Sequence, residues 1–323
     1  MYEDFIKQAR KIYGSSFIPL HRPVFEGNER VYLEECIETN FVSSVGAKVT
    51  EFEEMIAEFT NSKFAVATVN GTAALHTSIQ LAGVKHGDEV ITQSLTFVAT
   101  CNAIAYCGAS PIFVDVDLDT MGLSPNALEK FLNENAVHKK GKLINKNTNK
   151  RIAGCVPMHT FGFPCRIEEI SDICIKWGIP LIEDIAESLG SYVHDTHTGN
   201  FGKMGTLSFN GNKVITTGGG GMIITNDEEL AIRAKHITTT SKMPHEYEFV
   251  HDEVGYNYRM PNLNAALGCA QVEQLSDFLK KKDEISQIWR NFFHNYEDIN
   301  FFTGIENTKS NNWLNVIIMS SKK

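Results

Sequence analysis

The residue best suited to chemistry in this sequence is a lysine that stands between two strand-like runs. Lys213 follows the run 206–209 and precedes four consecutive glycines at 218–221, after which a second β-type run begins at Met222. An amine at a strand end beside a glycine-rich turn can point into a cleft, where loss of hydration lowers its pKa and makes it a nucleophile. The alternative from this stretch alone is a hydrated surface lysine in a hairpin turn.

Two further segments supply donors for an anion. Gly71 and Thr72 directly follow the buried strand expected at 64–69 and open a helix. A glycine at such a corner exposes backbone N–H groups, and a helix N-terminus favours negative charge, so phosphate binding and simple helix capping are both open. Ser208, five positions before Lys213, offers a second hydroxyl on the same side of the sheet.

A carboxylate and an aromatic ring complete the set. Asp184 ends the apolar strand expected at 180–185, where burial is costly unless the charge is paired. It suits a proton on a heteroaromatic nitrogen, or the N-cap of the next segment. Phe97 follows another strand and is suited either to stacking on a planar ring or to the core.

An amine, a buried carboxylate, an aromatic plate and two phosphate donors together indicate pyridoxal phosphate, with the lysine forming the Schiff base. A nicotinamide site is disfavoured because no G-x-G-x-x-G follows the first strand, and the glycines at 218–221 precede a strand. A P-loop and a G-x-S-x-G elbow are absent from the sequence. We expect no metal, because His194 and His197 have H-x-x-H spacing in a polar turn and are interpreted as solvated.

Composition narrows the class of partner. The 323 residues carry a formal net charge of −9, with no basic stripe for nucleic acid and no apolar run long enough for a membrane. The seven cysteines form no C-x-x-C pair, and the N-terminus lacks the apolar core of a signal peptide. We therefore expect a cytoplasmic protein that binds neither nucleic acid nor membrane.

Strands and helices alternate from residue 63 onward, which predicts parallel βαβ units with helices on both faces of a sheet. The basic stretch 138–151 is expected to be a surface loop or β-turn insertion. Residues 262–296 are predicted to form one long helix or two, and 311–319 are strand-like.

Nine ordered stretches resemble the DegT/DnrJ/EryC1/StrS family of nucleotide-sugar aminotransferases: FVSSVGAKVTEFEE, VNGTAALH, DEVITQSLTFVATCNAI, PIFVDVD, PMHTFGFP, IEDIAESLGS, FGKMGTLSFNGNK, TTGGGGMIITND and GYNYRMPNLNAALGCAQ. The resemblance implies an α/β fold of the fold-type I pyridoxal phosphate-dependent class. It implies a three-layer αβα large domain with a mostly parallel sheet at 31–240, preceded by an arm at 1–30. A smaller C-terminal domain would occupy 241–323 and be incomplete, because relatives usually continue for several dozen residues.

The resemblance also implies roles for single residues. Lys213 would form the Schiff base and move the proton, and Asp184 would pair with the pyridinium nitrogen. Asn257 would reach the phosphate bound to the neighbouring subunit, which implies a homodimer with shared active sites. The other implied cofactor contacts are Gly71, Thr72 and Ser208 at the phosphate, Phe97 stacked on the ring, His159 near the cofactor or sugar, and Glu187, where the family often has glutamine near the ring hydroxyl.

The implied reaction is transfer of an amino group from L-glutamate to a UDP-sugar. The stretch SFNGNKVITTGGGG most resembles the branch acting on UDP-4-keto-6-deoxy-N-acetylhexosamines, which supplies legionaminic acid- or bacillosamine-type sugars for bacterial surface glycans such as lipopolysaccharide. One alternative is a truncated partner that binds the cofactor but is catalytically impaired. Another is a sugar dehydratase of the same family, against which Lys213 argues because those enzymes usually carry histidine there.

Overall fold

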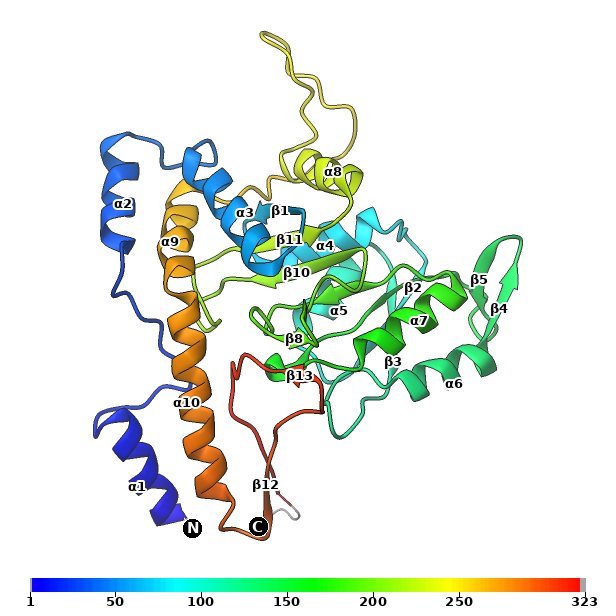
Figure 1. Ribbon diagram of the computed structural model, residues 1–323. Helices are drawn as coiled ribbons and strands as arrows, with labels where there is room; N and C mark the ends of the chain where they lie inside the picture. Colours follow the sequence, from blue (N-terminus) through cyan, green and yellow to red (C-terminus); the bar gives the residue numbers. More distant parts are fainter. Residues whose placement is uncertain (1, 320–323) are drawn as a thin grey trace.

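A seven-stranded mixed sheet forms the centre of the molecule (Figure 1). The computed structural model describes residues 2–319. In spatial order the strands are β1 (Phe64–Thr68), β11 (Gly221–Thr225), β10 (Met204–Ser208), β7 (Ile182–Asp184), β6 (Ile152–Val156), β2 (Glu89–Gln93) and β3 (Ser110–Val114). A parallel bridge between Cys155 and Leu181 joins its two halves. β11 runs antiparallel to both neighbours, and the other pairs are parallel. The sheet is therefore mostly parallel, as the resemblance implies.

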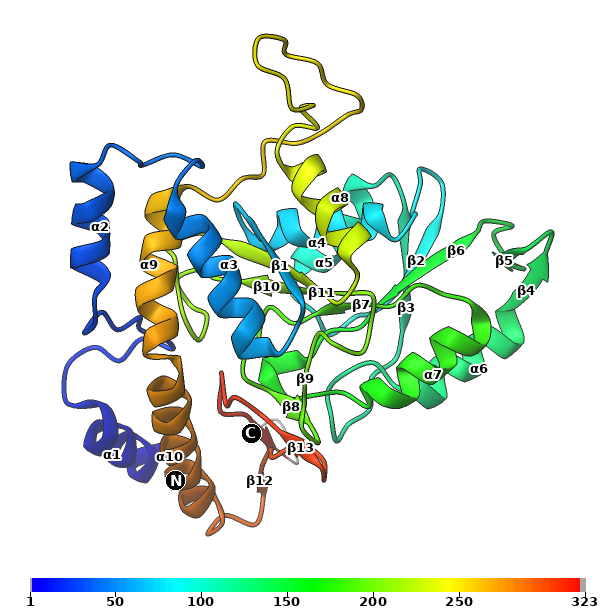
Figure 2. The same cartoon turned by 45° about the horizontal axis from the view of Figure 1, so that its top comes forward.

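Helices cover both faces of this sheet (Figures 1 and 2). The helices that pack on one face are α4 (Gly71–Leu81), α5 (Val98–Tyr106) and α8 (Glu228–Thr238). Those that pack on the other are α3 (Ala47–Thr60), α6 (Pro125–Asn135), α7 (Ile167–Trp177) and α9 (Asn262–Glu273). Buried β-branched and aliphatic side chains of the strands meet apolar helix faces in three clusters, which confirms the predicted three-layer αβα architecture.

Outside the three layers, α2 (Glu29–Glu38) packs beside α9, and α1 (Tyr2–Tyr13) lies against the far end of α10 (Leu275–Phe293). The ring of Phe5 lies 5.2 Å from that of Trp289. The predicted helical region 262–296 is two helices, because the chain breaks at Gln274. Since α9 shares a core with α3, residues beyond 240 pack on the predicted large domain, and the boundaries at 30 and 240 remain predictions.

The remaining elements are short. The predicted insertion at 138–151 contains the hairpin of β4 (Ala136–Lys139) and β5 (Lys142–Asn145). The others are the 3₁₀ turn η1 (Thr160–Gly162) and the strands β8 (Tyr192–Val193), β9 (Thr196–His197), β12 (Ile299–Phe301), β13 (Thr308–Lys309) and β14 (Ile317–Met319). Within residues 2–319, no helix is both long and apolar enough to cross a membrane.

Two local predictions are wrong. The stretch 311–319 forms a strand only at its end, because the Asn311 side chain accepts a hydrogen bond from the Trp313 N–H at 2.9 Å and closes a turn instead. His197 is not solvated. It is 1% exposed, its ring accepts from the Gly190 N–H at 2.8 Å, and burial lowers its pKa to about 4.

Candidate active site

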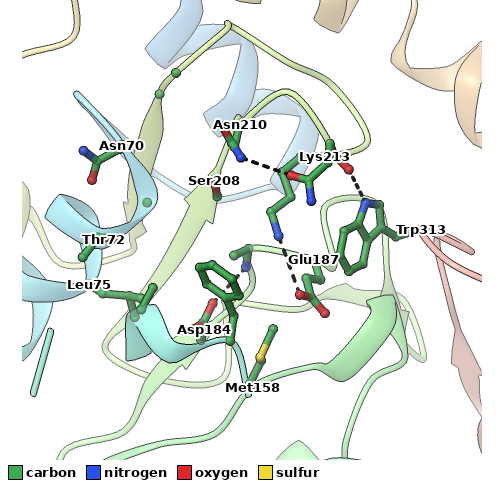
Figure 3. Close-up of a pocket in the computed structure, with 17 residues that line it drawn as sticks. Asn70, Thr72, Leu75, Met158, Asp184, Glu187, Ser208, Asn210, Lys213 and Trp313 are labelled. Atoms are coloured by element: carbon green, nitrogen blue, oxygen red, sulfur yellow. Dashed lines mark hydrogen bonds and ion pairs between the residues drawn. The ribbon is translucent and has the colours of Figure 1, made fainter. Parts of the chain in front are cut away.

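A pocket lies at the carboxyl ends of the parallel strands β7 and β10, where α/β sheets place their ligands. Its cavity volume is about 210 Å³. It brings together Lys213, Asp184, Glu187 and Ser208 with the corner at Gly71 (Figure 3). Residues separated by more than 100 positions in the sequence therefore meet in one site, which the sequence analysis predicts from strand ends alone.

Lys213 points into this pocket from the turn after β10. The turn is closed by a hydrogen bond from the Lys213 N–H to the Asn210 carbonyl at 3.0 Å. The side chain is 12% exposed, and its Nζ lies 3.6 Å from Glu187 Oε1 and 4.4 Å from the centre of the Trp313 ring (Figure 3). The surface-lysine alternative is therefore wrong, and the amine is held in a largely water-excluded site.

Asp184 ends β7 with its carboxylate buried to 2% exposure. Oδ2 accepts from the Thr100 hydroxyl at 2.7 Å, and Oδ1 accepts from the Ala186 N–H at 3.1 Å. Burial raises the pKa of Asp184, and these two donors act in the opposite direction. A buried carboxylate whose hydrogen bonds come from neutral donors can take up a protonated nitrogen from a ligand.

The corner at Gly71 is built by close backbone approach. A Cβ added to Gly71 would lie 2.8 Å from the Ser208 Cβ, and one on Gly221 would lie 2.4 Å from the Asn70 carbonyl carbon. The Asn70 side chain caps α4 by accepting from the Ala73 N–H at 2.8 Å. Capping and anion binding are therefore compatible, since the cap leaves the first N–H groups of α4 and the hydroxyls beside them facing the pocket.

We expect Gly71→Ala to raise the dissociation constant of the pyridoxal phosphate site roughly tenfold. The new methyl group collides with Ser208 and forces the corner apart, and such overpacking costs about 1–3 kcal/mol. Gly211→Ala is the matched control, since a Cβ at Gly211 meets nothing within 4 Å. Equilibrium binding by absorbance measures both. Equal affinity for the two variants would contradict a phosphate contact at this corner.

The other predicted site residues differ in where they lie relative to the pocket. Phe97 lines the pocket and is 66% exposed, so it is available for stacking and is not part of the core. His159 is fully buried and is not among the pocket-lining residues, although its neighbour Met158 is. Its Nδ1 accepts from the Cys165 N–H at 3.2 Å, so Nε2 carries the proton facing Glu183 Oε2 at 3.1 Å. Asn257 is exposed and lies outside the pocket of its own chain.

Glu187 is the second acid of the pocket and is 7% exposed. Its Oε2 accepts from the Phe161 N–H at 2.8 Å, and its Oε1 faces Lys213. Burial raises the pKa of Glu187 to about 7, against the opposing effect of the Lys213 cation. The raised value means that the folded protein disfavours the charged form, so Glu187 lowers stability as pH rises from about 4.5 through 7.

We expect Glu187→Gln to stabilise the cofactor-free protein at pH 8 by on the order of 1–3 kcal/mol, and to leave stability at about pH 4, below the unfolded pKa, nearly unchanged. Urea unfolding at the two pH values measures this difference. Glu183→Gln is the contrasting variant, because the Glu183 carboxylate accepts from the Gly199, Phe201 and Gly202 N–H groups, each at 2.8 Å. That substitution should destabilise, and stabilisation by both variants would contradict the assignment.

Sequence reasoning missed Trp313. Its indole ring lines the pocket, is 8% exposed and faces Lys213, although it lies 100 positions further along the chain. No sequence motif around Trp313 indicates a role in the site. The only signal was a large aromatic residue in a polar stretch, NNWLN, at a distance that sequence alone cannot connect to Lys213.

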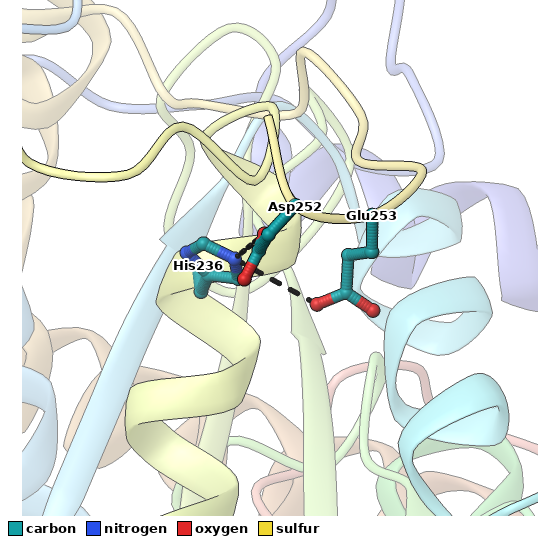
Figure 4. A group of neighbouring side chains, drawn as sticks. All are labelled: His236, Asp252 and Glu253. Atoms are coloured by element: carbon teal, nitrogen blue, oxygen red, sulfur yellow. Dashed lines mark hydrogen bonds and ion pairs between the residues drawn. The ribbon is translucent and has the colours of Figure 1, made fainter. Parts of the chain in front are cut away.

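A possible cation site lies elsewhere, at the end of α8 (Figure 4). Ligand atoms of His236, Asp252 and Glu253 lie within 4.8 Å of one another. His236 Nε2 is 2.7 Å from Asp252 Oδ1, and Arg233 donates to both oxygens of Glu253 at 2.6 and 3.0 Å. The guanidinium already supplies the positive charge that a metal would bring, so this group fastens the segment after α8 to the helix.

The fold and the pocket together define a class of protein: an α/β enzyme whose lysine, buried carboxylate and phosphate corner fit pyridoxal phosphate. Residues 24–323 match the model of the DegT/DnrJ/EryC1/StrS aminotransferase family, and the chain belongs to this family. It is a pyridoxal phosphate-dependent sugar aminotransferase.

Relatives support the assignment. GDP-perosamine synthase of Escherichia coli O157:H7 is 40% identical over 274 residues, which are 85% of this chain and 71% of the relative. The putative pyridoxal phosphate-dependent aminotransferase EpsN of Bacillus subtilis (strain 168) is 36% identical over 97% of this chain and 76% of its own. Among solved structures, the aminotransferase TlmJ from Streptoalloteichus hindustanus has a TM-score of 0.83 at 26% identity, covering 94% of this chain and 79% of TlmJ.

Proposed function

We propose that this enzyme transfers an amino group from L-glutamate to the keto carbon of a nucleotide-linked sugar in bacterial surface-glycan biosynthesis. The observation that carries the proposal is the placement of Lys213 between Glu187 and Asp184 beside the Gly71 corner. When bound, pyridoxal phosphate supplies the electron sink of the reaction. The sugar and the donor are proposed from the sequence resemblance and from the relatives.

Each side chain has a defined role in this proposal. Lys213 Nζ bonds the cofactor and moves the proton at the reacting carbon, and Asp184 holds the proton on the ring nitrogen. The phosphate is bound by Gly71, Thr72 and Ser208, all on the pocket wall. Phe97, which has an exposed ring at the pocket, stacks on the cofactor ring. Glu187 stands near the ring hydroxyl and keeps Lys213 oriented.

Two nucleotide sugars are candidates. The stretch SFNGNKVITTGGGG favours a UDP-4-keto-6-deoxy-N-acetylhexosamine. The relatives named GDP-perosamine synthase in Escherichia coli O157:H7 and Vibrio cholerae, 40% and 36% identical, favour a GDP-linked substrate. The nucleotide is therefore the specificity element to be measured first.

The deciding experiment incubates the cofactor-loaded protein with L-glutamate and a panel of UDP-, GDP- and dTDP-linked 4-keto sugars, with product mass by mass spectrometry. We expect an amino sugar from the UDP or the GDP substrate. Cofactor binding without turnover of any keto sugar would favour the catalytically impaired partner. A chain that binds no pyridoxal phosphate would refute the proposal.

We further propose a homodimer in which Asn257 reaches the phosphate bound in the other subunit. In support, Asn257 is exposed and follows a loop that projects from the body in Figures 1 and 2. That loop exposes Tyr247 by 80% and Phe249 by 78%. Light scattering should give twice the chain mass, and Asn257→Asp should weaken cofactor binding by repelling the phosphate. A monomer with full cofactor affinity contradicts this arrangement.

A further inference from the structure

The segment Ser310–Trp313, which we call the strap, crosses the pocket wall without belonging to any helix or strand. Two of its side chains are buried: Asn311 is 3% exposed and Trp313 is 8% exposed. A buried asparagine must satisfy its amide groups internally, so its partners show what the strap holds.

Asn311 fastens the strap to the loop that carries Glu187. Its Nδ2 donates to the carbonyls of Glu187 at 2.8 Å and Leu189 at 2.9 Å. Its own N–H donates to the Ser191 hydroxyl at 3.0 Å. Since Oδ1 accepts from the Trp313 N–H, one side chain joins the Glu187 loop to the tryptophan.

The strap also reaches the turn that orients the Glu187 carboxylate. The Ser310 and Ser191 hydroxyls donate to the Gly162 carbonyl at 3.0 and 2.7 Å. Phe161, the residue before Gly162, donates its N–H to Glu187 Oε2. The backbone and the carboxylate of Glu187 are therefore both held by elements that the strap ties together.

Trp313 fastens the other end to the lysine turn. Its indole Nε1–H donates to the Asn212 carbonyl at 2.6 Å, and its ring face lies 4.4 Å from Lys213 Nζ (Figure 3). Lys282 of α10 donates to the Trp313 carbonyl at 3.3 Å, which holds the backbone of the tryptophan. A cation over an indole face is stabilised and restricted in position, so the ring limits where the amine can go.

We propose that Trp313 and Asn311 are positioning residues, which together hold Lys213 Nζ and Glu187 at the spacing needed for Lys213 to bond the cofactor. The strap acts through Lys213, and among residues 2–319 its hydrogen bonds include none to Asp184 or to the corner at Gly71. This inference rests on the proposed role of Lys213 and is independent of which sugar is aminated.

The test compares two ligands of the cofactor-free protein. Pyridoxal 5′-phosphate has an aldehyde with which Lys213 reacts, whereas pyridoxamine 5′-phosphate occupies the same phosphate corner without bonding to lysine. Stopped-flow absorbance gives the rate of covalent capture of the aldehyde, with borohydride trapping and peptide mass spectrometry to confirm Lys213. Equilibrium titration gives the dissociation constant of the amine form.

We expect Trp313→Met, which fills the space without an aromatic face, to slow capture about tenfold. Trp313→Phe, which keeps a ring, should restore the rate to within about threefold of wild type, and Asn311→Ala should slow capture like Trp313→Met. All three should bind pyridoxamine phosphate as wild type does. Trp289→Phe is the matched control, because that indole donates to the Tyr13 hydroxyl at 3.2 Å, outside the pocket.

Two results overturn the inference. One is capture by Trp313→Met at the wild-type rate. The other is loss of pyridoxamine phosphate affinity in parallel with the rate, since that pattern indicates general support of the fold. A wild-type protein that captures no aldehyde at Lys213, yet binds the amine form, would instead refute the role proposed for Lys213 and with it the role of the strap.

Discussion

Replacement of Lys213 by alanine should abolish the visible-edge absorbance of the cofactor-loaded protein and lower transamination by roughly 10⁴-fold or more, because one amine supplies both the covalent bond and the mobile proton. The pocket contains no second lysine among the lining residues that the structure describes. The variant should still bind pyridoxal phosphate non-covalently through the Gly71 corner, with a weaker dissociation constant.

Absorbance spectra and single-turnover kinetics with L-glutamate measure these effects. Lys203→Ala is the matched control, since Lys203 immediately precedes β10 at the end of the strand opposite Ser208 and is exposed. Borohydride treatment should fix the cofactor to the wild-type peptide containing Lys213 and leave the variant unmodified. Label on another lysine of the wild-type protein would refute the assignment.

Asp184→Asn should lower the activity of the enzyme without lowering its stability. We expect the rate of transamination to fall roughly 10²- to 10³-fold, because an amide cannot hold a full positive charge on the ring nitrogen. The cofactor-free variant should be at least as stable as wild type at pH 8. The pKa of Asp184 is raised by burial, so its charged form is disfavoured in the folded state and costs stability above the unfolded pKa.

The pH effect has the same sign as that of Glu187, because burial raises the pKa of both carboxyl groups. As pH falls below the raised folded pKa, the wild-type protein takes up the proton and the cost declines. It vanishes only below the unfolded pKa, so the two proteins should approach each other in stability as the solution becomes more acidic. The asparagine oxygen can accept from the Ala186 N–H, and the Thr100 hydroxyl can rotate to accept from the amide NH2, which keeps both local contacts. Thermal melts of cofactor-free protein from pH 5 to 8 test this, and a variant that is less stable at pH 8 would contradict it.

The sequence analysis succeeds where the signal is local. Strand ends predicted at 64–69 and 180–185 fall within one or two residues of those in β1 and β7, because buried strands of such a sheet are continuous apolar runs bounded by polar residues. Since such strands end at the same edge of a sheet, the residues just past them are predicted to meet. Lys213, Asp184 and Gly71 do meet at that edge.

The sequence analysis fails where tertiary contacts decide. His197 is interpreted as solvated because its neighbours are polar, yet its ring nitrogen accepts from the Gly190 N–H in a closed turn. For Phe97 the sequence leaves stacking and the core both open, and only the structure shows that the ring is exposed at the pocket. The two ring nitrogens of His159 are directed to Cys165 and Glu183, and its place near the cofactor or sugar stays a prediction.

The sequence by itself determined the layer architecture, the family and which residues are candidates for the site, namely Lys213, Asp184 and the corner at Gly71, because each is encoded by neighbours along the chain. Only the tertiary structure decided the spacing of Lys213 and Glu187, the raised pKa of Glu187 and the place of Trp313 over the amine. These properties depend on burial and on contacts between segments that lie far apart in the sequence, such as Lys213 and Trp313. No periodicity or local motif records such contacts, since they exist only once the layers have packed.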